Sequence, residues 1–276
     1  SKGRLYEESM ALLEEAGIKI PGGKRTLLVP ARNFPVEVLF LRDDDIPESV
    51  ASGVTDVGIV GLNEVMEKRC PVGILKKLGF GKCRLSLAIP QDIDYLDRNW
   101  FSGKKIATSY PGILSDYLHQ NGIVSDIHVI TGSVEIAPGI RLADAIFDIV
   151  SSGSTLVSNR LKEVETVVES EAVLIGTDSI SPEKRGILDE LLFRFDSVQA
   201  ADDKKYILMN VPQKKLNDVL SVLPGIKSPT VMPLADKEWC SVHTVLDEKC
   251  FWEIINRLKT AGAEGILVLD IEKMIL

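Results

Sequence analysis

A run of small, hydroxyl-bearing residues follows an apolar segment near the middle of the chain. The apolar segment, residues 145–150, predicts a buried strand, and residues 156–161 predict the start of a helix. Between them lie Ser151, Ser152, Gly153, Ser154 and Thr155. A strand, a turn of small residues and a helix start direct several backbone N–H groups to one point, where an anion is favoured. The spacing therefore predicts a phosphate-binding loop.

Asp148 lies at the carboxyl end of this predicted strand, where a carboxylate is unusual for a phosphate site. It suits sugar hydroxyls or a Mg²⁺ ion carried by a ligand. The competing interpretation is an ordinary βα turn in which a Ser or Thr caps the helix. The stretch has neither the Gly-Lys-Ser/Thr of a P-loop nor the GxGxxG of a dinucleotide site.

Composition limits the classes of protein that fit. The chain has 276 residues, 45% of them hydrophobic and 26% charged, which is typical of a globular protein with two or three domains. A net charge of −8 argues against nucleic acid as the main partner. No apolar run approaches the length of a membrane span, and the first residues lack a signal-peptide core.

Four scattered cysteines without a CxxC pair, and three histidines far apart in sequence, predict no metal site built by a side-chain motif. The same cysteine usage predicts a cytoplasmic protein.

Helical and strand patterns alternate through the first 170 residues. Such alternation predicts an α/β fold with largely parallel sheets. One pattern occurs twice, since Asp56 and Gly61 have the same spacing as Asp148 and Gly153. Two similar lobes that bind a ligand between the carboxyl ends of their strands would explain the repetition. Chance is the alternative for so short a pattern.

The last 75 or so residues have a different pattern. Strands are predicted at 206–211, 229–233, 239–245 and 265–271, with helices at 214–223 and 249–261. This βαββαβ order is that of a ferredoxin-like domain. The polar stretch 197–205 is predicted to be the linker before it. The domain brings no evident acid, base or nucleophile, which indicates a regulatory or associative role.

Eight segments, in order along the chain, resemble the long form of the ATP phosphoribosyltransferase family. They are KGRLYEES (2–9), LRDDDIP (41–47), DVGIVG (56–61), CRLSLA (83–88), KIATSYP (105–111), GSVEIAP (132–138), LADAIFDIVSSGSTL (142–156) and SPTVMPLAD (228–236). The resemblance implies two lobes like those of periplasmic binding proteins, followed by a ferredoxin-like regulatory domain. It implies a first catalytic lobe at 1–85 to which 170–198 return, a second lobe at 86–169, and the regulatory domain at 200–276. The family has a strand before KGR, which implies residues ahead of this sequence.

The resemblance also implies a reaction, in which N1 of the adenine of ATP attacks C1 of phosphoribosyl pyrophosphate (PRPP) and releases pyrophosphate. This is the first step of histidine biosynthesis, a glycosyltransferase reaction with Mg²⁺ bound through the substrate. The resemblance assigns Arg4 and Arg25 to the pyrophosphate as catalytic residues. It assigns the 5-phosphate and ribose of PRPP to Glu135, Asp148, Ser151, Ser152, Gly153, Ser154, Thr155 and Leu156.

Further residues follow from the resemblance. Tyr110 and Arg84 are candidates for contact with ATP, with a core tyrosine and a surface strand residue as the alternatives. Asn210, Thr230 and Gly265 fall where the family binds histidine, the feedback inhibitor. Some relatives carry an acidic residue in place of Asn210. The family forms homo-oligomers, dimers and hexamers. The alternative function is a two-lobed small-molecule binding protein without catalysis.

Overall fold

The computed structural model describes residues 3–21, 26–224 and 229–275. Contacts between Cα atoms divide the chain into two compact units, residues 1–188 and 189–276. Each unit has its own sheets and is described separately below.

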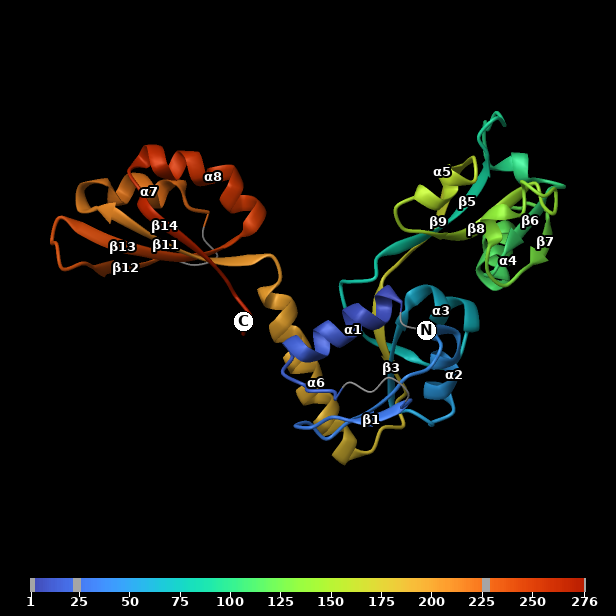
Figure 1. The fold of residues 1–276 in the computed structure, drawn as a ribbon, viewed down its shortest axis with the longest axis horizontal. Helices are drawn as coiled ribbons and strands as arrows, with labels where there is room; N and C mark the ends of the chain where they lie inside the picture. Colours follow the sequence, from blue (N-terminus) through green and yellow to red (C-terminus); the bar gives the residue numbers. More distant parts are fainter. Residues whose placement is uncertain (1–2, 22–25, 225–228, 276) are drawn as a thin grey trace. The chain divides into compact units, whose positions relative to one another are not determined.

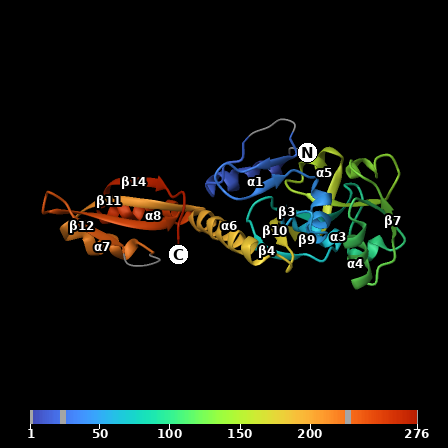
Figure 2. The same cartoon turned by 90° about the horizontal axis from the view of Figure 1, so that it is seen from below.

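The boundary between the units lies inside helix α6 (Pro182–Ala201), which Figure 2 shows as one continuous helix. The prediction of a polar linker at 197–205 is therefore wrong. Residues 197–201 complete the helix, and strand β11 begins at Lys204. Ser197 and Ala201 are buried, so the polar side chains of this stretch belong to the exposed face of an ordered element.

The first unit contains a three-stranded antiparallel sheet in the order β3-β10-β4. Its strands are β3 (Val57–Gly61), β10 (Ala172–Gly176) and β4 (Gly73–Lys77). A separate antiparallel pair joins β1 (Leu28–Pro30) to β2 (Glu37–Leu39). The helices of this part are α1 (Arg4–Glu15), the 3₁₀ turn η1 (Asp43–Asp45), α2 (Ile46–Ala51) and α3 (Leu62–Lys68).

A five-stranded sheet, in the order β7-β6-β8-β5-β9, forms the rest of the first unit (Figure 1). Its strands are β5 (Cys83–Pro90), β6 (Lys105–Thr108), β7 (Asp126–Val129), β8 (Ala145–Val150) and β9 (Leu161–Ser170). The accompanying helices are η2 (Arg98–Phe101), α4 (Pro111–Gln120), η3 (Val134–Ile136) and α5 (Ser154–Ser158).

The α/β class is confirmed, but the prediction of largely parallel sheets is wrong. In the five-stranded sheet, β6 pairs parallel with β7 and β8, whereas β5 pairs antiparallel with β8 and β9. The reason is that β5 carries the chain into this sheet from β4, and β9 carries it back to β10. Two such connecting strands run in opposite directions when they lie side by side.

The core of the five-stranded sheet accounts for its sequence. Leu85, Leu87, Ile106, Leu114 and Phe147 are fully buried in one cluster. Burial of a side chain of this size contributes about 1.5–3 kcal/mol relative to exposure. The apolar segments that form β5, β6 and β8 are thus the segments that hold this part of the chain together.

The two Asp-x₄-Gly patterns occupy different places, so they do not mark equivalent sites. Asp56 precedes the first residue of β3 and binds Lys184 at 2.7 Å, whereas Asp148 lies inside β8. Gly61 has an extended φ of −67°, but Gly153 has a left-handed φ of +78°.

The second unit has the βαββαβ order that the sequence predicts. Its elements are β11 (Lys204–Pro212), the 3₁₀ turn η4 (Gln213–Lys215), α7 (Leu216–Val222), β12 (Thr230–Pro233), β13 (Trp239–Asp247), α8 (Glu248–Ala261) and β14 (Glu264–Asp270). The strands pair antiparallel in the order β12-β13-β11-β14, which is the ferredoxin-like arrangement. Both helices cover one face of this sheet (Figure 1), and Phe251, Ile254 and Leu258 of α8 are buried against it.

Candidate functional site

The carboxyl ends of two neighbouring parallel strands bring most of the predicted site residues together. β6 and β8 pair in parallel, with Thr108 opposite Phe147. The segments that follow these strands therefore leave the sheet at the same edge, which is where ligands bind in α/β sheets. Tyr110 follows β6, Asp148 lies near the end of β8, and the residues after β8 lead into α5.

Residues 151–156, called the hydroxyl loop below, leave several backbone donors available. The amides of Gly153, Thr155 and Leu156 donate to no acceptor in the described part of the chain. The Oγ atoms of Ser152 and Ser154 are 2.9 Å apart, and both side chains are exposed. Leu156 is buried, so it can offer a ligand only its backbone. The loop thus has the donors that an anion requires.

Helix α5 begins at Ser154, two residues earlier than the sequence predicts, and ends before β9 begins at Leu161. Gly153 precedes it with a left-handed φ of +78°. A Cβ on Gly153 would meet only Cγ1 of Val150, at 4.0 Å, so glycine is favoured here by backbone conformation.

Two carboxylates lie beside this loop. Burial raises the pKa of Asp148 to about 6; the backbone N–H of Ile149 lowers it, and the negative charge of Glu135 raises it further. The Ile149 amide donates to Asp148 Oδ1 at 2.8 Å. Glu135 is the middle residue of η3, and Ser133, which precedes this turn, has a left-handed φ of 52°. The negative charge of Glu135 thus acts on Asp148 in the same direction as burial.

Tyr110 is part of the core and of a hydrogen-bonded network at once. Its side chain is buried in the cluster of the five-stranded sheet. Its hydroxyl donates to Glu64 Oε1 at 2.9 Å and lies 3.3 Å from Asn63 Nδ2. Burial and the carboxylate of Glu64 raise the pKa of Tyr110, so the phenol stays protonated. Its contact with ATP stays a prediction.

The guanidinium of Arg84, on β5, is held by its own chain. Nε and Nη2 each donate to a separate oxygen of Glu163 at 2.5 Å, and Nη1 donates to the carbonyl of Ser151 at 3.3 Å. The hydrogen bonds from Arg84 hold the pKa of Glu163 down at about 2. Contact between Arg84 and ATP also stays a prediction.

Of the two predicted catalytic arginines, the structure describes Arg4, which lies in another part of the first unit. Arg4 is the first residue of α1, and its Nη2 donates to the carbonyl of Lys82 at 3.0 Å, beside the start of β5. Its Nε lies 3.8 Å from Glu8 Oε1, and the side chain is 56% exposed. Arg25 lies outside the described residues.

A set of contacts between α3 and α4 was not predicted. The carboxylate of Glu67 accepts hydrogen bonds from the backbone N–H groups of Gly112 and Ile113 at 2.8 and 2.9 Å. Arg69 donates to the carbonyl of Gly112 at 3.0 Å and to Asp116 at 2.7 Å. A Cβ on Gly112 would lie 3.0 Å from Glu67 Oε1, so glycine permits this approach. No local pattern in the sequence connects residues so far apart along the chain.

In the second unit, two of the three predicted effector residues line one cavity of about 370 Å³. Asn210 and Gly265 lie in its wall, with Leu234, Asp236, Trp239 and Glu264. The cavity lies where a register shift interrupts the pairing of β11 with β14, and Gly265 has a left-handed φ of +55°. Thr230, on β12, pairs with His243 and is not among the lining residues.

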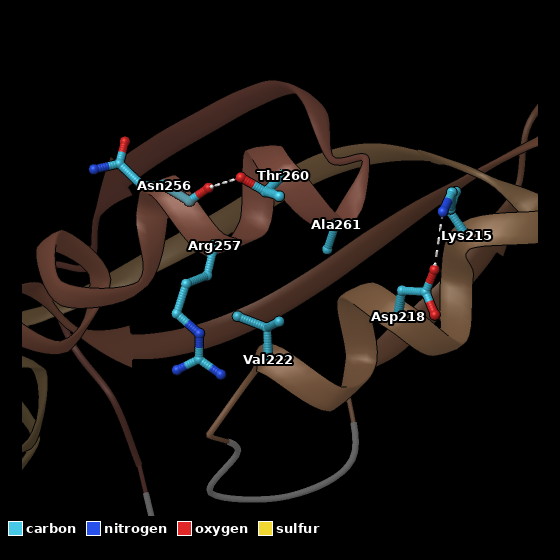
Figure 3. Close-up of a pocket in the computed structure, with 7 residues that line it drawn as sticks. All are labelled: Lys215, Asp218, Val222, Asn256, Arg257, Thr260 and Ala261. Carbon is cyan, nitrogen blue, oxygen red and sulfur yellow. Dashed lines mark hydrogen bonds and ion pairs between the residues drawn. The ribbon is translucent and has the colours of Figure 1, made fainter.

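A second cavity, of about 470 Å³, lies between α7 and α8 (Figure 3). Lys215 and Asp218 form an ion pair of 3.2 Å at one side, and Arg257 reaches in from the other. None of the predicted site residues lines it.

The described residues show neither a preformed metal site nor a membrane-spanning helix. They contain no group of three or more His, Cys, Asp or Glu side chains placed to hold a metal ion. No helix in this part of the chain combines the length and apolar character needed to cross a bilayer.

Comparison with known proteins gives consistent matches. The family described as HisG, ATP phosphoribosyltransferase, matches residues 42–197, and the family described as HisG, C-terminal domain, matches residues 201–273. ATP phosphoribosyltransferases of Bacteroides fragilis and Phocaeicola vulgatus are each 70% identical over 276 residues, which is all of this chain and 98% of theirs. The ATP phosphoribosyl transferase (HisG:HisZ) complex from Thermotoga maritima contains a chain with a TM-score of 0.60 and 26% identity. The match covers 70% of this chain and 95% of that one.

Proposed function

The chain belongs to the ATP phosphoribosyltransferase family, and we propose that it joins the phosphoribosyl group of PRPP to N1 of the adenine of ATP. The enzyme is a pentosyltransferase that acts at the first step of histidine biosynthesis. The observation that supports the proposed chemistry most directly is the hydroxyl loop, whose free amides lie beside Asp148 at the carboxyl end of β8.

Each group of this site has a proposed role. The amides and hydroxyls of residues 152–155 would bind the 5-phosphate, and Asp148 would accept hydrogen bonds from the ribose hydroxyls. Displacement at C1 passes through an oxocarbenium-like state in which negative charge grows on the leaving pyrophosphate. Arg4 and Arg25 would stabilise that charge. No general base is needed, because adenine N1 has a free lone pair.

The residues present fit a Mg²⁺ ion that arrives with its substrate. Asp148 and Glu135 supply the oxygen ligands that this ion prefers, and the described residues provide no complete site of their own. When bound, Mg²⁺ neutralises charge on the pyrophosphate. Addition of a chelator should therefore stop turnover, and excess Mg²⁺ should restore it.

A direct assay separates this function from that of a binding protein without catalysis. The purified chain, mixed with ATP, PRPP and Mg²⁺, should produce the near-ultraviolet absorbance of phosphoribosyl-ATP. Binding of both substrates without this absorbance would favour the binding protein.

We also propose that histidine binds the cavity of about 370 Å³ in the second unit and inhibits the enzyme. Asn210 cannot supply the charge that an acidic residue gives some relatives. Asp236 and Glu264 line the same cavity, however, so carboxylates are present for the amino group of the ligand. We further propose that the enzyme is a cytoplasmic homo-oligomer, a dimer or a hexamer, which sedimentation would measure.

Gly265→Val tests the effector site. A Cβ at Gly265 would lie 3.4 Å from the amide nitrogen of Asn210, which also lines the cavity, and the φ of +55° would strain valine there. We expect the inhibition constant for histidine to rise more than about tenfold, since each mispacked methyl group opposes binding by about 1–3 kcal/mol. Arg257→Ala, in the cavity between α7 and α8, is the control and should keep normal inhibition. Equal sensitivity of both variants to histidine would place the effector elsewhere.

A further inference from the structure

We propose that Arg84 and Glu163 are positioning residues for the hydroxyl loop, so that Arg84 acts on PRPP binding through Ser151 and not by contact with ATP. This inference rests on the proposed function of the loop. It assigns a role to Glu163, which no sequence pattern singled out.

The bridge crosses three strands of the five-stranded sheet. β5 lies between β8 and β9, so Arg84 has Glu163 of β9 on one side and the end of β8 on the other. Arg84 is in register with Val150, the last residue of β8. The next carbonyl along the chain, that of Ser151, accepts from Nη1 at 3.3 Å. The hydrogen bond from Arg84 thus attaches the chain to the sheet at Ser151, one residue beyond the end of β8.

Glu163 is itself fixed from several directions, which makes it a firm support for Arg84. Its Oε1 accepts from Ser86 Oγ at 2.7 Å and from Thr166 Oγ1 at 3.2 Å, in addition to Arg84 Nε. The side chains of Arg84 and Glu163 are only 34% and 24% exposed. A bidentate pair in this environment is stronger and more directional than an ordinary surface ion pair.

The position of Ser151 matters because the loop must hold its donors in place before the ligand arrives. Gly153 has a left-handed conformation only two residues after Ser151, and the free amides follow it. A shift of the Ser151 carbonyl would move these amides together. Sites that bind through several convergent donors lose affinity when such a shift is as small as about 0.5–1 Å.

Most of the N–H donors of Arg84 already have acceptors within the chain. A guanidinium has five N–H donors, and three of them are used by Glu163 and Ser151. An ATP phosphate on the same group would have to compete with a carboxylate that holds it in two places.

Arg84→Gln, compared with Arg84→Lys, tests the proposal. Glutamine removes the bridge, and we expect the KM for PRPP to rise about tenfold while the KM for ATP stays within about twofold, the size expected for loss of one charge-assisted hydrogen bond. Lysine keeps the charge and one contact with Glu163 but cannot reach both partners, so a smaller rise of about threefold in the KM for PRPP is expected. Arg194→Gln is the matched control, since Arg194 also pairs with a glutamate, Glu190, at 2.6 Å but lies on α6.

Hydrogen exchange of the free protein gives a readout that does not depend on catalysis. Exchange at the loop is read at Val157 and Asn159, whose amides donate to the loop carbonyls of Gly153 and Thr155. Both amides should exchange faster in Arg84→Gln than in the unmodified chain, and those of α4 should not change. Glu163→Gln should have a similar but weaker effect, and the double variant should add little to Arg84→Gln, because both changes break one bridge.

Wild-type exchange in the loop together with a wild-type KM for PRPP would overturn the proposal. A rise in the KM for ATP alone would also overturn it, and would instead make Arg84 an ATP contact. If the glutamine variant fails to fold, Arg84→Lys and Glu163→Gln decide by the same measurements. Absence of turnover by the unmodified enzyme would refute the proposed function, whereas altered exchange in the loop would still support the bridge.

Discussion

Gly153→Val is expected to abolish measurable PRPP binding, with a loss of affinity of at least about a hundredfold. The free chain has room for a side chain at this position, since only Val150 lies within 4.0 Å of the added Cβ. The space that valine would fill is the approach to the amides of residues 153–156. A phosphate that loses two or more such hydrogen bonds loses about 1.5–3 kcal/mol for each. Calorimetry with PRPP and Mg²⁺ measures the effect.

The matched control for this change is Gly122→Val. Gly122 has a φ of +65° with nothing within 4 Å of an added Cβ, so valine meets the same backbone strain there as at Gly153. We expect both variants to lose similar stability, on the order of 1–2 kcal/mol, and only Gly153→Val to lose PRPP. Normal PRPP affinity in Gly153→Val would refute the assignment of the loop.

Asp148→Asn should stabilise the fold at neutral pH while it removes most of the activity. The folded pKa of about 6 lies above the ordinary value of 3.8, so the native state binds more protons than the unfolded chain between these values. Stability therefore falls as pH rises from about 4 to 6, and above pH 6 the charged carboxylate costs up to about 3 kcal/mol. Asparagine avoids this cost, and we expect a gain of roughly 1–2 kcal/mol at pH 8.

The pH dependence identifies the cause of that gain. The difference in the free energy of unfolding between Asp148→Asn and the unmodified chain should be near zero at pH 3.5 and reach its full size above pH 6, as denaturant titration would show. Loss of the carboxylate should also lower kcat/KM for PRPP about 10- to 100-fold, if it binds the ribose. Asp126→Asn, which removes an exposed carboxylate 3.8 Å from Lys105, should change stability by less than about 1 kcal/mol at either pH. A gain that is constant with pH would contradict this explanation.

Local sequence predicts most single elements of this chain. The bounds of β8 match the predicted segment 145–150 to the residue, because it is a short apolar segment with most of its residues buried. The order of elements in the second unit was also predicted, since each helix there ends in a clear turn; Gly262, with a φ of +109°, closes α8. These features depend only on neighbouring residues.

Features that depend on distant parts of the chain were not predicted. Buried and polar residues are interspersed along the whole length of helix α6. The sequence of its last residues therefore resembles that of a linker. The antiparallel strands β9 and β10 result from the return of the chain between two sheets, which no short window of sequence records. In the candidate site, the types and spacing of residues predict Asp148 and the hydroxyl loop as ligand-binding groups, which stays a prediction. The partners that hold this region, Glu64, Glu67 and Glu163, come from other strands and helices and carry no local signal.

The carboxylate of Glu67 affects which helix start in this part of the chain can bind an anion. Two helices begin at the edge where β6 and β8 end, and each would ordinarily attract an anion to its first turn. At α4, the chain satisfies that attraction with its own glutamate, and the charge of Glu67 repels any competitor. Of these two positions, the turn before α5 is the one whose amides at Gly153, Thr155 and Leu156 find no acceptor among the described residues. With the 5-phosphate bound there as proposed, a substrate with several phosphates would meet one receptive position rather than two, which would fix its orientation before any bond is broken.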